Sequence, residues 1–548
     1  MGEIVLVFLI KKTWQRFVAT ALSSVIFGII SVSLVALINE IINAKGERQT
    51  EFFWIFAALA ISGVVVQLIS KLVAEQLSEH SQAELRKLVA DKTIEAKISH
   101  IELQGDAKIK SCLTEHSLKV AGFFMSMPGI LTNAMIVLGA FVYMAWLDWL
   151  IFLFALLTLV LGSVSYSFAN NVAFKKIANA AAMQDSLFQQ FDAITDGIKE
   201  LKLNRSKRAF FKLEVLHPAI NALRKERIEG VSILHMASSW GGFLIFTFIG
   251  GALYFLSQQT GEESQRIMSG FALLFLYMLT PLETLLANIP RAFAAQASAN
   301  TIKTLTDELM SDDGNSVQVF TQFNSIQLHA LCHRYYHEQS DDIFSLKPID
   351  LEFKQGELIY LVGGNGSGKT TFAKVLCGLY EADEGEIVVD NQPISGAGLD
   401  AYRQLFSTVF GDYYLFDRLL NVPCDQLERK GNELIRKLNL HHKVSIESGR
   451  FTTQRLSQGQ RKRLALVVAY LEDRPFYLFD EWAADQDPVF KDVFYRELLP
   501  ELRNKGKTIL VISHDDKYFS LADRLLKMEN GCLTEVSQLP VTQTPALA

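Results

Sequence analysis

Long runs of apolar residues dominate the first three hundred positions of the chain. Six of them reach about 20 residues or more, which lets an α-helix cross the roughly 30 Å of hydrocarbon in a bilayer. Buried helices of a soluble protein are the alternative, but six such runs favour membrane spans. The runs cover residues 17–43, 52–74, 121–146, 149–172, 231–256 and 268–290.

The charges between these runs indicate how the spans are oriented. Short loops join the spans in pairs, whereas long connections at about residues 75–120 and 173–230 separate the pairs and carry many Lys and Arg residues. Cytoplasmic loops of membrane proteins are enriched in these residues. We therefore expect the long connections, both termini and the whole chain beyond the sixth span to be cytoplasmic.

The long connections keep a helical pattern, so we expect them to extend the spans into the cytoplasm as stalks. Near their turns lie Glu102 to Ile109 (ELQGDAKI) and Asp196 to Asn204 (DGIKELKLN). Each is either a solvated turn or a coupling helix that docks on the second half of the chain and transmits motion.

Several polar residues lie in or near the apolar runs. Ionisable groups within a span usually face a cavity or a partner, although long side chains near a helix end extend to the interface instead. Glu283, which follows Pro281, is the candidate that we favour for a cavity. The others are Asn39, Glu40, Gln67, Lys71, Asn133 and Asn170.

The pattern changes after residue 308. Residues 309–320 are polar and turn-forming and indicate a linker, residues 321–538 form a second domain, and the polar residues 539–548 indicate a mobile tail. In the second domain, Leu361 to Phe372 (LVGGNGSGKTTF) lies between a predicted strand and a predicted helix. This stretch matches the phosphate-binding loop G-x-x-x-x-G-K-[ST], in which backbone N–H groups surround phosphates.

The loop predicts specific nucleotide contacts. Lys369 can contact the β- and γ-phosphates, and the Thr370 hydroxyl can bind Mg²⁺. The other expected contacts come from Gly363, Gly364, Asn365, Gly366, Ser367, Gly368 and Thr371. The sequence therefore predicts an ATP site with Mg²⁺ as its metal.

Two carboxylates end a second apolar segment, Pro475 to Trp482 (PFYLFDEW). We expect Asp480 to hold Mg²⁺, directly or through water. Glu481 is placed to polarise the water that attacks the γ-phosphate.

A further motif lies between these two elements. Leu456, Ser457, Gly459 and Gln460 complete the pattern L-S-x-G-Q. The serine hydroxyl, the glycine N–H and the N-terminus of the next helix form a second phosphate cradle. This pattern is the signature of the ATP-binding-cassette (ABC) transporter family, which the chain resembles over essentially its whole length. In that family the cradle closes on nucleotide held by the opposite domain, so the resemblance implies a homodimer with two ATP molecules between its subunits.

The resemblance implies roles for further residues. Asp487 corresponds to the acid of the family's D-loop, and His514 in LVISHD to the switch histidine that senses the γ-phosphate. Tyr335 is the expected aromatic partner of adenine, with Tyr336 as the second choice. The expected catalytic residues are therefore Glu481, His514 and Lys369.

One position departs from the family pattern. Gly411 stands where the family has a glutamine that contacts Mg²⁺ and the membrane domain, and Asp412 follows it. Either Asp412 binds the metal in its place, or the metal depends on Thr370, Asp480 and water.

Three segments resemble cyclic-peptide exporters in particular, a group that includes exporters of microcins and of pyoverdine-type siderophore precursors in Gram-negative bacteria. They are residues 406–420 (FSTVFGDYYLFDRLL), 480–488 (DEWAADQDP) and 197–204 (GIKELKLN).

The expected fold is an exporter-type α-helical transmembrane domain with six spans and stalks (residues 1–308), followed by an α/β P-loop cassette. We expect a homodimer in the bacterial inner membrane that exports a peptide-like compound. A lipid or multidrug exporter on the same scaffold, and an ATP-gated channel or regulatory membrane ATPase, stay open as alternatives. The small net charge of −6 argues against a nucleic-acid partner.

Overall fold

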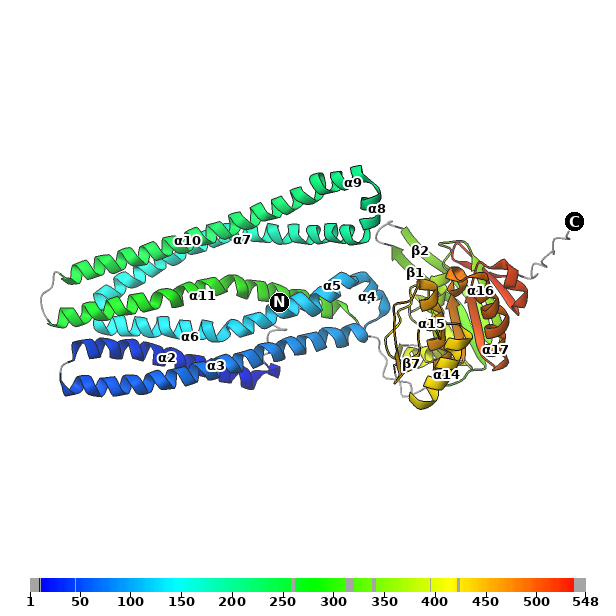
Figure 1. Ribbon diagram of the computed structural model, residues 1–548, viewed down its shortest axis with the longest axis horizontal. Coiled ribbons are helices and arrows are strands. Elements are labelled where there is room, and N and C mark those ends of the chain that lie inside the picture. The colour runs from blue at the N-terminus through cyan, green and yellow to red at the C-terminus, as the bar shows by residue number, and fades with distance from the viewer. Residues whose placement is uncertain are drawn as a thin grey trace. The chain divides into compact units, whose positions relative to one another are not determined.

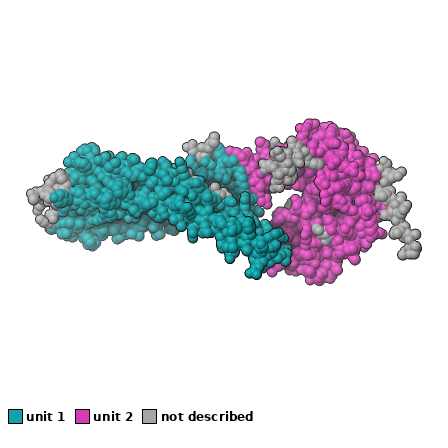
Figure 2. Space-filling model, turned by 90° about the horizontal axis from the view of Figure 1, so that it is seen from above, with its two compact units in different colours: residues 1–91, 107–306 teal, residues 92–106, 307–548 magenta. Residues whose placement is uncertain are grey.

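The computed structural model describes residues 9, 11–44, 46–257, 262–311, 320–337, 342–394, 396–420 and 424–536. The chain forms two compact units (Figure 2): unit 1 holds residues 1–91 and 107–306, and unit 2 holds residues 92–106 and 307–548. Most of the predicted linker and the whole predicted tail lie outside the described residues.

Unit 1 is built from long helices (Figure 1). Within the described residues these are α2 (Trp14–Asn43), α3 (Glu47–Ile94), α6 (Ser117–Leu147), α7 (Trp149–Asp196), α10 (His217–Ser257) and α11 (Glu262–Glu308). Short helical segments lie between them, namely α5 (Asp106–Ser111), η1 (Cys112–His116), α8 (Ile198–Leu203), α9 (Arg205–Phe210) and η2 (Phe211–Leu216). α2 packs along α6, and α7 packs along α10.

Six of these helices are long and apolar enough to cross a membrane, which confirms the six predicted spans. Four of them, α3, α7, α10 and α11, are much longer than a span requires. α3 has 48 residues, and at 1.5 Å per residue a helix of that length is about 72 Å long. Because the hydrocarbon layer is about 30 Å thick, α3 is longer than a span requires, and the placement of its extension as a cytoplasmic stalk stays a prediction.

Polar side chains determine where the helices of unit 1 begin and how they pack. Asp148 separates α6 from α7, because its carboxylate accepts hydrogen bonds from the N–H groups of Leu150 and Ile151 at 2.8 and 3.0 Å. Asn39 on α2 is fully buried and donates to the Tyr143 hydroxyl at 3.1 Å. Asn39 therefore faces a partner helix, in line with the expectation for polar residues inside a span.

Unit 2 contains two larger β-sheets and one two-stranded sheet. The six-stranded sheet has the order β12-β11-β3-β10-β9-β6, and all its neighbouring strands are parallel except β11 and β12. The four-stranded antiparallel sheet has the order β2-β1-β4-β5. The strands are β1 (Ser325–His337), β2 (Asp342–Lys354), β3 (Leu358–Gly363), β4 (Glu384–Val389), β5 (Gln392–Ile394), β6 (Phe406–Val409), β7 (Ile446–Glu447), β8 (Arg450–Phe451), β9 (Phe476–Asp480), β10 (Thr508–Ile512), β11 (Arg524–Glu529) and β12 (Cys532–Glu535).

Helices cover the six-stranded sheet, and alternate residues of its strands enter two different cores. Tyr477 and Phe479 of β9 belong to the core that includes α15 (Gln458–Glu472). Phe476 and Leu478 belong to the core that includes α12 (Lys369–Leu376) and the antiparallel sheet. The helices of unit 2 are α4 (Ile98–Gln104), α12 (Lys369–Leu376), η3 (Gly396–Gly398), α13 (Leu399–Arg403), α14 (Cys424–Lys437), α15 (Gln458–Glu472), η4 (Trp482–Asp485), α16 (Pro488–Val493), η5 (Phe494–Leu498), α17 (Leu499–Asn504) and η6 (Asp516–Leu521). The α/β cassette is confirmed.

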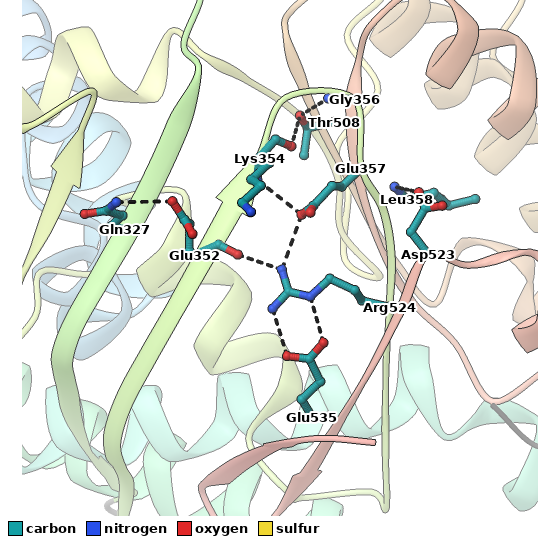
Figure 3. Close-up of polar contacts among 10 residues, drawn as sticks. All are labelled: Gln327, Glu352, Lys354, Gly356, Glu357, Leu358, Thr508, Asp523, Arg524 and Glu535. Atoms are coloured by element: carbon teal, nitrogen blue, oxygen red, sulfur yellow. Dashed lines mark hydrogen bonds and ion pairs between the residues drawn. The ribbon is translucent and has the colours of Figure 1, made fainter. Parts of the chain in front are cut away.

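A polar cluster around Arg524 joins the two sheets near the start of β3 (Figure 3). The Arg524 guanidinium donates to both carboxylate oxygens of Glu535 at 2.9 and 3.0 Å and to the Glu352 carbonyl at 2.7 Å. The neighbouring Asp523 carboxylate accepts a bond from the Leu358 N–H at 2.9 Å. These bonds fix the position of β3, the strand that leads into the phosphate loop.

Candidate functional site

The phosphate loop lies between β3 and α12, as predicted, and its conformation depends on glycine. A Cβ on Gly363 would lie 2.3 Å from the Met528 carbonyl oxygen of β11 and 2.9 Å from Ser367 Oγ. Gly366 and Gly368 have φ angles of +76° and +104°, values that L side chains rarely adopt. The loop therefore requires glycine at these positions.

Lys369 is the first residue of α12 and comes directly after the last glycine of the phosphate loop. The Lys369 side chain is buried, and its Nζ donates to the Gly363 and Gly364 carbonyl oxygens at 2.9 Å each. Asn365 precedes it in the loop, and Thr371 lies in the first turn of α12. Because the free N–H groups at a helix N-terminus point toward the preceding residues, this turn is suited to phosphate oxygens.

Asp480, at the end of β9, lies beside this loop. The Thr370 hydroxyl donates to Asp480 Oδ2 at 2.8 Å. Asp480 is 3% exposed, and its Oδ1, like Ser367 Oγ, is buried with no hydrogen-bond partner within the described residues. Burial raises the pKa of Asp480, and the charge of Asp412 acts in the same direction. A buried carboxylate with a free oxygen is costly unless it binds a cation, so Thr370 and Asp480 fit a Mg²⁺ site with Asp412 nearby.

Glu481 and His514 follow two neighbouring parallel strands, since Asp480 of β9 is paired with Ile512 of β10. His514 Nε2 lies 3.4 Å from Glu481 Oε1. Their side chains are 49% and 43% exposed, so water can reach the pair. Glu481 has a φ of +49°, a strained backbone value of the kind that gathers at functional sites.

The signature motif forms a capping box. The Ser457 hydroxyl accepts a bond from the Gln460 N–H at 3.4 Å, and Gln460 Oε1 accepts one from the Ser457 N–H at 3.1 Å. The Gln486 amide donates to the Gly459 carbonyl at 3.0 Å and accepts from Arg463 Nε at 3.0 Å. Gln486 is buried and was missed by the sequence analysis, because its role depends on these side-chain bonds and on no sequence pattern.

Asp487 and Tyr335 were also predicted to contact nucleotide. The Asp487 carboxylate begins α16 by accepting bonds from the Val489 and Phe490 N–H groups at 3.1 and 3.2 Å. Its role toward nucleotide stays a prediction. Tyr335 is paired with Phe344 in the β1–β2 ladder, but the side chains of Tyr335 and Tyr336 lie outside the described part of the structure.

Helix α4, which comes from the first long connection, packs within unit 2. Glu102 Oε1 lies 3.0 Å from Lys374 Nζ on α12, and the Tyr380 hydroxyl donates to Glu102 Oε2 at 2.5 Å. Lys97 Nζ lies 2.6 Å from Glu381 Oε2. Burial lowers the pKa of Lys374, but its bonds to Glu102 and Tyr380 outweigh that effect and raise the pKa overall.

These contacts show that α4 docks on the second half of the chain, as one of the two alternatives for Glu102 to Ile109 requires, and its role in transmitting motion stays a prediction. The Glu102–Lys374 contact connects α4 to α12, whose first residue is Lys369. The second candidate, Asp196 to Asn204, contains α8 in unit 1, and its docking stays a prediction.

Unit 2 contains a phosphate loop with carboxylates and a histidine beside it, and unit 1 contains six helices of membrane-spanning length. Together these features define a membrane protein driven by ATP. The ABC transporter family profile matches residues 346–484. The chain is 34% identical to the ATP-binding protein SyrD of Pseudomonas syringae pv. syringae, over 97% of this chain and 96% of that protein. The chain therefore belongs to the ABC transporter family, and it hydrolyses ATP in order to drive transport.

A more distant relative and a solved structure are similar to nearly the whole chain. An ATP-dependent lipid A-core flippase of Methylobacillus flagellatus is 23% identical over 96% of this chain and 91% of its own length. A solved structure of a bacterial Atm1-family ABC exporter with ATP bound superposes with a TM-score of 0.76 at 14% identity, over 95% of each chain. The exporter-type fold predicted from the sequence is confirmed.

Proposed function

We propose that two copies of this chain form an exporter that carries a peptide-like compound across the bacterial inner membrane. The observation that carries the dimer is the exposed signature loop. Ser457 is exposed, and its hydrogen bonds with Gln460 and Arg461 stay within its own helix. The cradle is therefore available to the phosphate loop of a second copy, and a two-fold dimer would contain two such composite sites.

In this proposal each ATP lies between Lys369 of one copy and Ser457 of the other. The Glu481 carboxylate accepts a proton from a water molecule while the water oxygen attacks the γ-phosphorus. The bond between that phosphorus and the β–γ bridging oxygen breaks, and ADP and phosphate leave. His514, beside Glu481, donates a hydrogen bond to a γ-phosphate oxygen.

Lys369 offsets the negative charge of the β- and γ-phosphates. Thr370, Asp480 and the neighbouring Asp412 would hold Mg²⁺, which would neutralise further phosphate charge. Gly411 has no side chain with which to bind Mg²⁺. In the segment that follows β6, Asp412 can replace the missing glutamine as a metal ligand.

A groove in unit 2 is a candidate docking site for the second coupling segment. It has a volume of about 250 Å³ and includes Tyr414 and Phe416, which are 75% and 54% exposed. In unit 1, Leu203 of α8 is 88% exposed. We infer that α8 of the second copy places this apolar side chain in the groove and so transmits closure of the cassettes to the spans.

The segments at residues 197–204, 406–420 and 480–488 support a peptide-like cargo, since they resemble cyclic-peptide exporters. Mass spectrometry of bacterial cells and their medium tests this proposal. Cells with wild-type protein should release a peptide-like compound that cells with only the Glu481→Gln variant retain. Retention of a lipid instead would contradict the peptide assignment.

A lipid exporter is the second candidate, because the likeness to a lipid A-core flippase covers 96% of the chain. ATPase activity stimulated by lipids but not by cyclic peptides would favour it. An ATP-gated channel is disfavoured by the Glu481–His514 pair, which suits turnover. Loss of ATP-dependent cargo accumulation in inverted vesicles, with ATP binding intact, would favour the channel.

A further inference from the structure

A cavity of about 220 Å³ lies inside unit 1 between α7, α10 and α11. Most of its wall is apolar, with Phe248, Phe275, Met278 and Leu282 as its large side chains. Among the described residues that line it, Glu283 is the only one with a carboxylate or a cationic group. Glu283 belongs to the sixth membrane-length helix.

Glu283 differs from the other carboxylate that the sequence placed within a span. Glu40 forms an ion pair with Arg266. No ion pair or hydrogen bond of the Glu283 side chain is found within the described residues, and the side chain is exposed. Acidic groups inside spans are costly, and they face a cavity or a partner where they occur. The Glu283 carboxylate is therefore available to a ligand that enters the cavity.

The wall of the cavity is held together by a feature of α11. Pro290 has no N–H to donate to the Leu286 carbonyl four residues earlier. The Tyr166 hydroxyl of α7 donates to that carbonyl instead, at 3.4 Å. This bond joins α7 to α11 about one helical turn from Glu283.

Two hydroxyl groups in the cavity, like the Glu283 carboxylate, can accept hydrogen bonds from a ligand. The Thr158 hydroxyl donates to the Phe154 carbonyl at 2.9 Å, and the Tyr166 hydroxyl donates to Leu286. Both oxygens keep lone pairs that can accept a bond from a ligand N–H. A group with several N–H donors and a positive charge is therefore the best match for this set.

We propose that this cavity binds a cationic side chain of the cargo, an ammonium or guanidinium group, with Glu283 as its counter-ion. The inference rests on the proposed export of a peptide-like compound and names the chemistry that the cargo must carry. The cavity is smaller than the roughly 300–1,000 Å³ of sites that enclose a drug-sized ligand. It therefore takes one side chain of the cargo, and the apolar wall contacts the carbon atoms of that side chain.

A second cavity in unit 1 lacks this selectivity. It is lined by residues of both signs, Lys71, Arg291 and Glu75, so no single charge on a ligand is preferred there. Glu75 provides a matched control, because it is an exposed carboxylate on a membrane-length helix outside the Glu283 cavity.

The test uses the full-length protein in lipid nanodiscs and three cyclic peptides that differ at one side chain: Lys, norleucine or Glu. The peptide concentration that half-stimulates ATPase activity should be at least tenfold lower for the Lys peptide, a difference of about 1.4 kcal/mol. Glu283→Gln should remove this preference and Glu75→Gln should keep it. Basal ATPase activity and size-exclusion profiles check that the variants are folded.

Filling the cavity tests the position of the site without altering charge. A Cβ on Gly241, which lines the cavity, or on Gly250 of the same helix would meet no atom within 4 Å. Gly241→Leu should therefore weaken stimulation by the Lys peptide at least tenfold, and Gly250→Leu should not.

The outcomes separate this inference from the proposed function. If none of the peptides stimulates ATPase activity, peptide export itself is contradicted. If the three peptides stimulate equally, if Glu283→Gln keeps the preference for Lys, or if Gly241→Leu has no effect, the cationic site is wrong while peptide export stands.

Discussion

At the scale of single residues, the ends of β9 and β10 determine the chemistry. Parallel pairing in register brings the residues after both strands to the same edge of the sheet, so Glu481 and His514 meet although 33 positions separate them. The Glu481 backbone is held in its strained conformation by the bond from its N–H to the Ile512 carbonyl at 3.1 Å. This bond fixes the backbone from which the Glu481 carboxylate extends.

Glu481→Gln should abolish hydrolysis and preserve ATP binding, because the amide keeps the shape of the side chain but cannot accept the proton. We expect hydrolysis to fall about 10²- to 10⁴-fold, measured as phosphate release, with ATP affinity measured by fluorescence. Glu497→Gln, at an exposed site of the same unit, should change neither. Normal turnover in Glu481→Gln would exclude Glu481 as the base.

Gly363→Ala should damage the phosphate loop, whereas Gly364→Ala should not. A Cβ at Gly363 meets the Met528 carbonyl at 2.3 Å, and one at Gly364 meets no atom within 4 Å. Since backbone cannot easily move away, we expect a loss of stability of about 1–3 kcal/mol and weaker ATP binding. Thermal unfolding with and without ATP checks both effects, and equal behaviour of the two variants would contradict the steric argument.

The sequence predicted which candidate site residues lie together better than it predicted the residues that hold them in place. Thr370 and Asp480 belong to patterns with fixed spacing, and the structure shows them bonded to each other. Gln486 and Tyr380 belong to no such pattern, because their roles arise from side-chain bonds that only the folded chain creates. Residues of this second kind need three-dimensional information.

At the scale of elements, the spans were predictable because hydropathy and length alone define them. The docking of α4 was expected from the sequence only as one of two alternatives. Its contacts join Glu102 to Lys374, residues 272 positions apart. No local pattern encodes a contact of this range, so the sequence could not name the partner residues.

Glu102→Ala should uncouple the spans from the nucleotide site. Lys374 is 15% exposed and would lose its carboxylate partner. A stability loss of about 1–2 kcal/mol is expected for a charged hydrogen bond that is partly open to solvent. In nanodiscs, ATP binding should persist while stimulation by cargo is lost.

Glu95→Ala is the matched control, since Glu95 is exposed in the same segment. The exchanged pair Glu102→Lys with Lys374→Glu should restore part of the coupling. A Glu102→Ala variant with full cargo stimulation would exclude α4 as the transmitting element.

At the scale of the whole molecule, a composite site makes a distinctive prediction about mixed dimers. Lys369→Ala and Ser457→Ala should each abolish ATPase activity when expressed alone, because every site would lack one half. Co-expression of the two variants should restore activity, since a mixed dimer has one site with both residues intact. Purification through two different tags isolates the mixed dimer, and inactivity of that species would contradict sites shared between copies.

The assignment of residues 92–106 to unit 2 has a consequence for the meaning of a domain boundary in this chain. A gene fragment for residues 307–548 would encode every nucleotide motif but not α4. In that fragment, Lys374 would lose its carboxylate partner Glu102 and keep the Tyr380 hydroxyl. A cassette moved between membrane partners as one continuous piece would therefore leave behind a contact partner that the chain encodes between its second and third spans.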